Sequence, residues 1–150
     1  MPYTENSIII RGNAEDIFNC VLELENWPAF IPSIKHSRII GTHEGKELHE
    51  MSSRIYGIKS SWKSCLVALE PKKRINYKQL KGFCDEMEGE WILKEQAEGV
   101  HVTLTHDFEF NFPILDRCVV PILKKYVIRI SDCILEGIKS KIERENRNLL

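Results

Sequence analysis

The strongest constraint on the fold lies in the last third of the chain, from about Pro113 to Asn146. Apolar residues recur there at steps of three and four, which at about 100° per residue places them on one side of a helix. A helix of this length, rising about 1.5 Å per residue, needs a broad apolar surface to lie on. Pro121 predicts irregular or kinked first turns, with the main helix running from about Ile122. The apolar stripe consists of Val119, Leu123, Tyr126, Val127, Ile130, Ile134, Gly137 and Ile138.

The middle of the chain, from His36 to Phe112, changes to the two-residue period of β-strands, with turn residues at intervals of about ten positions. The segment from Val100 to Phe112 alternates most clearly, with His106 on the same side as the apolar residues. A second alternating segment has Met87, Gly89, Trp91 and Leu93 on one side. These patterns predict an antiparallel meander with one apolar face.

The segment from Ile58 to Leu69 is harder to interpret, because serines share one side with Trp62. The small polar side chains indicate either a partly hollow interior or a Ser-rich edge strand. Before the meander, Ser7 to Arg11 predicts a strand. Asn13 is a suitable N-cap for a short helix, and a second short helical piece is expected near Asn26. The order of elements predicts an α+β fold in a single domain over residues 1–150.

Composition excludes several functional classes. The net charge is −1 and the basic residues are spread along the chain, so no nucleic-acid surface is expected. No apolar run approaches the roughly 20 residues that span a membrane, and the N-terminus does not resemble a signal peptide. The five cysteines lack CxxC spacing, which predicts small buried side chains in a reducing cytoplasm. His36, His43, His49 and His101 fall near turns or on the polar strand face without metal-ligand spacing, so neither a metal nor a cofactor is expected.

Three stretches carry a resemblance to a known superfamily. They are the strand Asn6 to Ile10 followed by a helix and Glu25-Asn26-Trp27-Pro28-Ala29-Phe30, then Met87-x-x-x-Trp91, and then Leu104-Thr105-His106-Asp107-Phe108 before the long helix. With the order of elements, they resemble the helix-grip fold of the START-like, or SRPBCC, superfamily. Within it, the chain is most similar to the polyketide aromatase/cyclases (polyketide cyclase/dehydrase). The resemblance spans almost the whole chain and implies a curved antiparallel sheet of about seven strands, with the long helix over a cavity.

The resemblance also implies a function for that cavity. It would hold a poly-β-ketone delivered on an acyl carrier protein and direct its aldol cyclisation and dehydration, with Met87, Trp91, Leu104 and His106 lining the cavity. The sequence departs from the family in the arginines that relatives project from the middle strands. Depending on one gap, the matching position falls on Lys78 or on Leu80, and only Lys78 could polarise a carbonyl.

Four polar residues are therefore candidates for catalysis, and three of them have an alternative role. Lys78 is a candidate through the resemblance. His106 either exchanges protons near neutral pH or is a core histidine with satisfied hydrogen bonds. Arg54 either holds an enolate, if its strand face points inward, or forms a cross-strand ion pair if that face points outward. Tyr126, in the helix stripe, either donates to a ligand carbonyl or packs with its hydroxyl on a protein partner.

Two classes of function follow. The first is a polyketide cyclase; the second is a non-catalytic carrier of a hydrophobic small molecule, such as a lipid or quinone. Both need a hydrophobic or aromatic ligand in a cavity and no cofactor, in a protein that is a monomer or a homodimer. The residues expected to line this cavity, unless they are ordinary core, are Trp27, Phe30, Trp62, Met87, Trp91, Leu104, Phe108 and Ile130.

Overall fold

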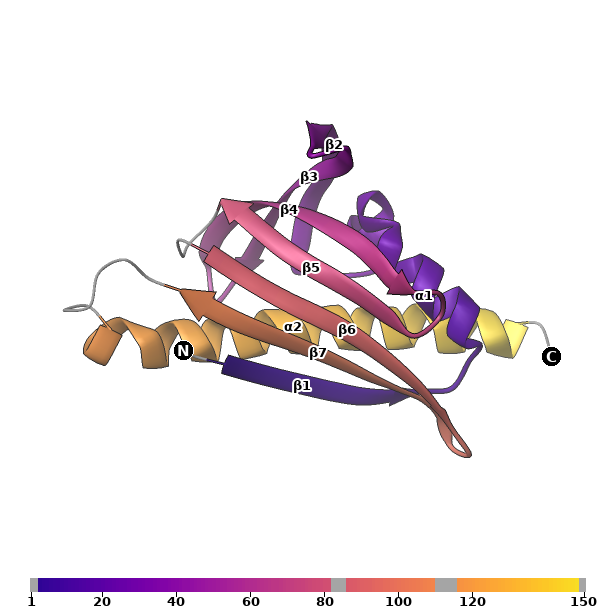
Figure 1. Ribbon diagram of the computed structural model, residues 1–150. Helices are drawn as coiled ribbons and strands as arrows, with labels where there is room; N and C mark the ends of the chain where they lie inside the picture. The colour runs from indigo at the N-terminus through magenta and orange to yellow at the C-terminus, as the bar shows by residue number, and fades with distance from the viewer. Residues whose placement is uncertain (1–2, 82–85, 110–115, 149–150) are drawn as a thin grey trace.

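A computed structural model describes residues 3–81, 86–109 and 116–148 of the chain. One long helix lies along one face of a curved sheet, and two short helical segments lie near one end of it (Figure 1). The elements, in chain order, are β1 (Tyr3–Ile10), α1 (Ala14–Leu22), η1 (Leu24–Ala29), β2 (Ile34–His43), β3 (Lys46–Ile55), β4 (Ile58–Glu70), β5 (Arg74–Lys81), β6 (Glu86–Gln96), β7 (Gly99–Glu109) and α2 (Asp116–Asn148).

The seven strands form one antiparallel sheet in the order β1-β7-β6-β5-β4-β3-β2. Strands β2 to β7 are a meander of sequence neighbours, and β1 is added beside β7 at the far edge. The apolar stripe of α2 faces this sheet, with Val127, Ile130, Ile134 and Ile138 buried. The helix-grip arrangement expected from the sequence is therefore confirmed.

Local sequence explains the short helices. The side chain of Asn13 accepts a hydrogen bond from the Glu15 backbone N–H at 2.7 Å and caps α1 as expected. The second helical piece is a 3₁₀ helix that begins at Leu24, before the expected start at Asn26. It is fixed to α1 by the Trp27 indole, which donates to the Cys20 carbonyl at 2.9 Å.

The long helix is continuous through Pro121. It starts at Asp116, inside the helical segment expected from about Pro113, so the expectation that the main helix runs only from about Ile122 is wrong. Pro121 lies close to the N-terminal end of the helix, where few intrahelical hydrogen bonds are affected. The first residues of the predicted helical segment, 113–115, and the predicted strand residues Phe110 and Phe112 lie outside the described residues.

The direction of the strand faces agrees with the sequence for β6 and β7, whereas the sequence left the direction of β3 open. His106 and Phe108 face inward with the apolar residues of β7. In β3 the buried residues include His49, so the expectation that His49 lies on the polar face is wrong. Strand β4 lies between β3 and β5, with Trp62 buried, so it is not an edge strand.

The cysteines behave as small core side chains where they are described. Cys20 and Cys65 are buried and Cys133 is half-buried, all with free thiols. Burial raises the pKa of the Cys20 thiol to about 11, which keeps it protonated at neutral pH. Cys84 lies outside the described residues.

A glycine in β6 allows two rings to meet on the inner face of the sheet. Gly89 lies between Tyr77 of β5 and His106 of β7 in the strand register. The two rings contact edge to face across it, with centroids 5.6 Å apart and planes at 81°. A Cβ atom at Gly89 would lie only 2.1 Å from the backbone oxygen of Thr105, so no side chain fits there.

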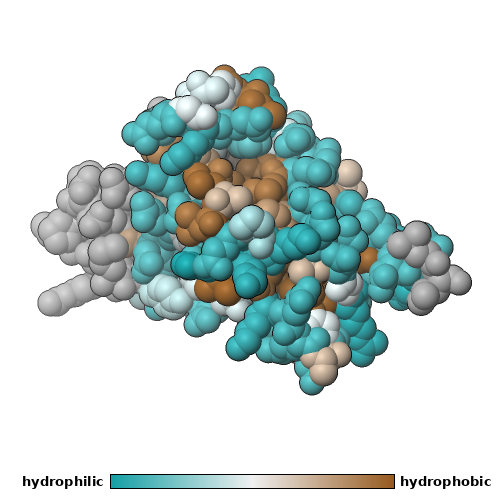
Figure 2. Space-filling view, turned by 45° about the vertical axis from the view of Figure 1, so that its right-hand side comes forward, coloured by the Kyte–Doolittle hydropathy of each residue, from teal (hydrophilic) through white to brown (hydrophobic). Residues whose placement is uncertain are grey.

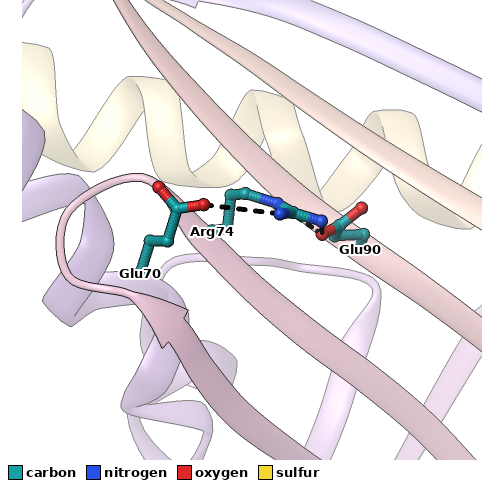
Figure 3. A network of polar contacts seen from close by, with 3 residues as sticks. All are labelled: Glu70, Arg74 and Glu90. Carbon is teal, nitrogen blue, oxygen red and sulfur yellow. Dashed lines mark hydrogen bonds and ion pairs between the residues drawn. The ribbon is translucent and has the colours of Figure 1, made fainter.

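On the outside of the sheet, Arg74 joins the β4–β5 turn to β6. Its guanidinium binds Glu90 through Nε at 2.7 Å and through Nη2, and it reaches Glu70 through Nη1 at 3.4 Å (Figure 3). Because this network is open to solvent, it contributes more to the position of the turn than to stability. It also keeps Arg74 away from the interior.

We expect Gly89→Ala to lower the free energy of unfolding by about 1–3 kcal/mol, because the added methyl group must displace a backbone oxygen in the neighbouring strand. Urea unfolding measures this. The neighbouring Glu88→Ala, on the exposed face, is the control and should change stability by less than about 0.5 kcal/mol. Equal stability of the two variants would show that β6 and β7 separate more easily than the structure indicates.

Candidate functional site

An internal cavity lies between the inner face of the sheet and α2. Its volume is about 40 Å³. Its walls are mainly apolar and come from η1, from β3 to β7 and from α2. The lining residues are Leu24, Trp27, Met51, Trp62, Leu66, Tyr77, Gln79, Met87, Trp91, Leu104, His106, Val127, Ile130, Ser131 and Ile134.

The size of this cavity limits what it can hold in the observed conformation. About 40 Å³ is room for a few water molecules. Pockets for drug-sized ligands typically have volumes of about 300–1,000 Å³. A ligand of that size requires the wall of the cavity to move outward.

Most of the residues predicted to line a cavity do so. His106 and Ile130 line it, together with Trp27, Trp62, Met87, Trp91 and Leu104. The chain has three tryptophans, and all three line this cavity. Trp27 and Trp91 pack edge to face, with their centroids 6.1 Å apart.

Two predicted lining residues lie elsewhere. Phe108 is buried beside the cavity, where it packs with Met87 and Val127, and its ring lies 6.4 Å from that of His106. Phe30 is half-buried and lines a separate surface groove, with the Lys141 ammonium 5.4 Å from its ring centroid. The motif that includes Phe30 therefore places Trp27, but not Phe30, in the cavity.

Three of the four predicted polar residues, Lys78, Arg54 and Tyr126, are not among the residues that line the cavity. Lys78 points outward because Tyr77 and Gln79, on either side of it in β5, point inward. Its side chain is 50% exposed, with Nζ 4.0 Å from Glu88. Arg54 is exposed near the end of β3, opposite Lys59 in the register, and lines a separate surface groove beside α2. Neither alternative for Arg54 is observed, because it does not line the cavity and no cross-strand ion pair joins it to a described residue.

Tyr126 of α2 makes a hydrogen bond to the β3–β4 hairpin beside the cavity. Its hydroxyl lies 2.9 Å from the Ser60 hydroxyl, which lies 3.0 Å from the Ser53 hydroxyl. This chain of three hydroxyl groups joins α2 to the β3–β4 hairpin. Of the two alternatives, the structure places the phenol on a protein partner.

Sequence reasoning missed three polar residues of the cavity. Tyr77 and Gln79 follow Ile75 at two-residue steps, so a strand phase fixed on the buried Ile75 would have found them. Ser131 lies between Val127 and Ile134 on the buried stripe of α2, and a small polar residue within an apolar stripe was the available signal. The Tyr77 hydroxyl donates to the Gln79 amide oxygen at 3.3 Å.

His106 is a neutral imidazole in this environment. Burial lowers its pKa from 6.5 to about 4, because the charged form would lose its hydration. No hydrogen-bond partner of its Nδ1 is found among the described residues. The Ser131 hydroxyl on the opposite wall is also buried without a described partner. Both of these unpartnered groups therefore line the same, mainly apolar cavity.

The described residues contain no group of three or more His, Cys, Asp or Glu side chains arranged to hold a metal ion. Within the same residues, no helix combines the length and apolar character needed to cross a membrane.

On the face of the molecule in Figure 2, polar side chains surround a hollow in which apolar side chains gather.

The pKa of His106 predicts that stability falls as the pH falls. Above pH 6.5 both the folded and the unfolded state hold a neutral imidazole, whereas between 6.5 and about 4 only the unfolded chain binds the proton. We expect the protein to lose about 2 kcal/mol more stability than the variant His106→Gln between about pH 7.5 and pH 5, as measured by urea unfolding. Equal losses in the two proteins would contradict a buried, neutral His106.

Comparisons with known proteins agree with this geometry. Residues 1–143 match the family model described as polyketide cyclase / dehydrase and lipid transport. The actinorhodin polyketide synthase bifunctional cyclase/dehydratase of Streptomyces coelicolor is 25% identical over 117 residues, which are 77% of this chain and 36% of that protein. The chain thus spans about a third of the length of that relative.

Solved structures share the fold at low sequence identity. The Zhui aromatase/cyclase from Streptomyces sp. R1128 has a TM-score of 0.79 at 22% identity, over 95% of this chain and 94% of that one. A START superfamily protein from Mycobacterium smegmatis has a TM-score of 0.77 at 16% identity, over 95% and 97% of the two chains. These structures show the fold, and the match over residues 1–143 shows that the chain belongs to the polyketide cyclase/dehydrase and lipid transport family.

Proposed function

We propose that the protein binds a largely apolar, aromatic or polyketide-like small molecule in the cavity beneath α2. The observation that carries this proposal is the pair of buried polar groups on opposite walls, His106 Nδ1 and Ser131 Oγ, that have no partner among the described residues. A ligand with oxygen atoms between them would hydrogen-bond to both. Burying such groups without partners costs free energy, so a ligand that pairs with them gains affinity by removing that cost.

The remaining walls supply the hydrophobic part of binding. Trp27, Trp62 and Trp91 present aromatic surface, which suits a planar ligand. The Gln79 amide adds one further polar group to an otherwise apolar enclosure. A few polar groups within apolar walls are typical of small-molecule sites, in which the polar groups orient a ligand that binds mainly through apolar contact.

A ligand larger than the observed cavity must separate α2 from the β3–β4 hairpin. That side of the helix is held by the Tyr126–Ser60 hydrogen bond. The opposite side is held to β1 by Asn6, whose amide donates to Asp132 at 2.7 Å and to the Ile128 carbonyl at 3.1 Å. We expect the helix to pivot on its contact with β1 and open on the hairpin side.

The variant Ser131→Ala tests the binding proposal. We expect it to bind an aromatic probe such as 1,4-naphthoquinone about 5–10-fold more weakly, the loss expected for one hydrogen bond. Quenching of the tryptophan fluorescence measures the affinity. Because the hydroxyl has no described partner in the ligand-free protein, the same change should leave the free energy of unfolding unchanged or slightly higher.

The exposed Ser140→Ala, on the same helix, is the matched control and should leave the affinity unchanged. If Ser131→Ala and Ser140→Ala bind the probe equally well, the cavity is not the site. Native mass spectrometry of freshly purified protein would independently show whether an apolar molecule is retained.

A second function, cyclisation and dehydration of a bound poly-β-ketone, is supported by the neutral state of His106. A neutral imidazole in a dry cavity can accept a proton from a carbon between two carbonyl groups. The resulting enolate carbon would attack a second carbonyl in the same chain, and the protonated imidazole would return its proton to the alkoxide that forms. The neutral imidazole would then remove the remaining proton of the same carbon and pass it to the hydroxyl, which leaves as water. The cavity would supply the folded geometry of the chain, which is the main requirement for this ring closure.

The predicted cationic donors, Lys78 and Arg54, take no part in this scheme. The developing oxyanion would instead be stabilised by neutral donors, the Ser131 hydroxyl and the Gln79 amide. The ketone chain would arrive on an acyl carrier protein. This second function rests further on the distant relative, which is named as a cyclase/dehydratase.

We expect the protein to change the products of a minimal polyketide synthase that makes an unreduced chain, and His106→Gln to reduce that change at least tenfold. Liquid chromatography with mass spectrometry measures the ratio of cyclised, aromatic products to spontaneous ones. Lys78→Gln, which alters an exposed neighbour of the cavity wall, should leave the ratio unchanged. Identical product profiles with and without the protein would rule out the enzymatic function but not ligand binding.

A further inference from the structure

A second concave site lies on the other flank of α2. It is a surface groove of about 640 Å³ between the η1–β2 connection, the β3–β4 turn and the helix. Its helix wall includes Arg129 and Cys133, whereas the internal cavity is lined by their neighbours Ile130 and Ile134. The groove is therefore separate from the cavity, although both use the same stretch of α2.

Three arginines line this groove. They are Arg54 from β3 and Arg129 and Arg144 from α2, and Glu136 is the acidic residue among the lining side chains. No ion pair joins any of the three to a carboxylate of a described residue. In contrast, Arg38 and Arg74, on other parts of the surface, are paired with glutamates. Like charges gathered around one concavity raise the local positive potential, which favours an anionic ligand.

The groove also has apolar surface beside these charges. Phe30, Ile55 and Tyr56 line it. Tyr56 is 73% exposed, which is a high value for an aromatic residue. Tyr56 has a φ of +54° and Gly57 a φ of +74°, so the β3–β4 turn holds a bulky residue in a left-handed conformation. This two-residue hairpin turn presents the Tyr56 ring beside the groove.

A close contact sets the depth of the groove. A Cβ atom at Gly137 would lie 2.7 Å from Ile31 Cγ1 and 3.0 Å from the Phe30 backbone oxygen. The absence of a side chain at Gly137 therefore allows the η1–β2 connection to approach α2. This approach brings the aromatic ring of Phe30 and the arginines of the helix to the same concavity.

We infer that this groove binds the phosphate group of an amphipathic phosphate monoester, with the apolar part of the ligand on Phe30, Ile55 and Tyr56. Guanidinium groups bind phosphate oxygens through two parallel hydrogen bonds, and three arginines against one glutamate match the two negative charges of a monoester. The groove is larger than a phosphate ion needs, which leaves room for the attached chain.

Isothermal titration calorimetry with octyl phosphate tests this site. Inorganic phosphate and 1-octanol are the probes for the charged and the apolar part alone. We expect octyl phosphate to bind at least tenfold more tightly than either. Arg54→Gln and Arg129→Gln should each lower the affinity for octyl phosphate about 5–30-fold, without changing the affinity for 1-octanol.

Arg38→Gln is the matched control, because it removes the same charge from another surface. If Arg38→Gln weakens binding as much as Arg54→Gln, or if 1-octanol binds as tightly as octyl phosphate, the inference is wrong. Vesicles that contain phosphatidic acid identify the source of the phosphate. If the protein sediments with these vesicles and Arg54→Gln abolishes the sedimentation, the ligand is a lipid. If the protein binds octyl phosphate but does not sediment with the vesicles, the ligand is a soluble phosphate ester.

Discussion

The structure depends on the packing of one amphipathic helix across a curved sheet. Val127, Ile130 and Ile134 of α2 supply the apolar surface that covers the inner strand faces. The hydrogen bonds that hold this helix to the sheet differ between its two sides. On the β1 side, Asn6 binds Asp132 and the Ile128 carbonyl, and Lys139 binds the Ile9 carbonyl at 2.7 Å. On the hairpin side, the Tyr126 hydroxyl hydrogen-bonds to the Ser60 hydroxyl.

This asymmetry connects the fold with the proposed binding function. A sheet closed tightly on both sides of the helix would have no route by which its interior could enlarge. The residues within the interior also oppose ideal packing, since Ser131 and His106 occupy positions where apolar side chains would be more stable. Departures from ideal packing that gather in one place are typical of functional sites rather than of core.

The sequence predicted the architecture because its periodic patterns were long. The alternation in β6 and β7 fixed which residues face inward, and the helical stripe identified α2. The phase of β3 could not be read in the same way, because polar residues occupy both of its faces and a buried histidine, His49, follows Leu48. A shift by one residue reverses every side chain of a strand, which is why Arg54 could not be placed.

The cavity could be predicted only in part for a related reason. Trp91, Leu104 and His106 lie on strongly patterned strands, whereas Gln79 lies on a strand that alternates weakly, next to Lys78. The choice between these two neighbours depends on the register with β4, which has an irregularity between Lys63 and Ser64. Such a bulge moves the strand by one position and leaves no clear signature in the composition of the strand. Long-range pairing, rather than local preference, therefore decides which polar side chain enters the cavity.

The position of β1 has a consequence for how the protein folds. Its partners are β7 and α2, and the Asn6–Asp132 hydrogen bond joins residues that are 126 positions apart. Forming these contacts requires closure of a very large loop, which is unfavourable until the meander between them is in place. During synthesis the meander can assemble first, but its apolar face stays uncovered until the last helix is made. We therefore expect the docking of α2 onto β1 to be a late and slow step of folding, and the cavity to be completed only at that step.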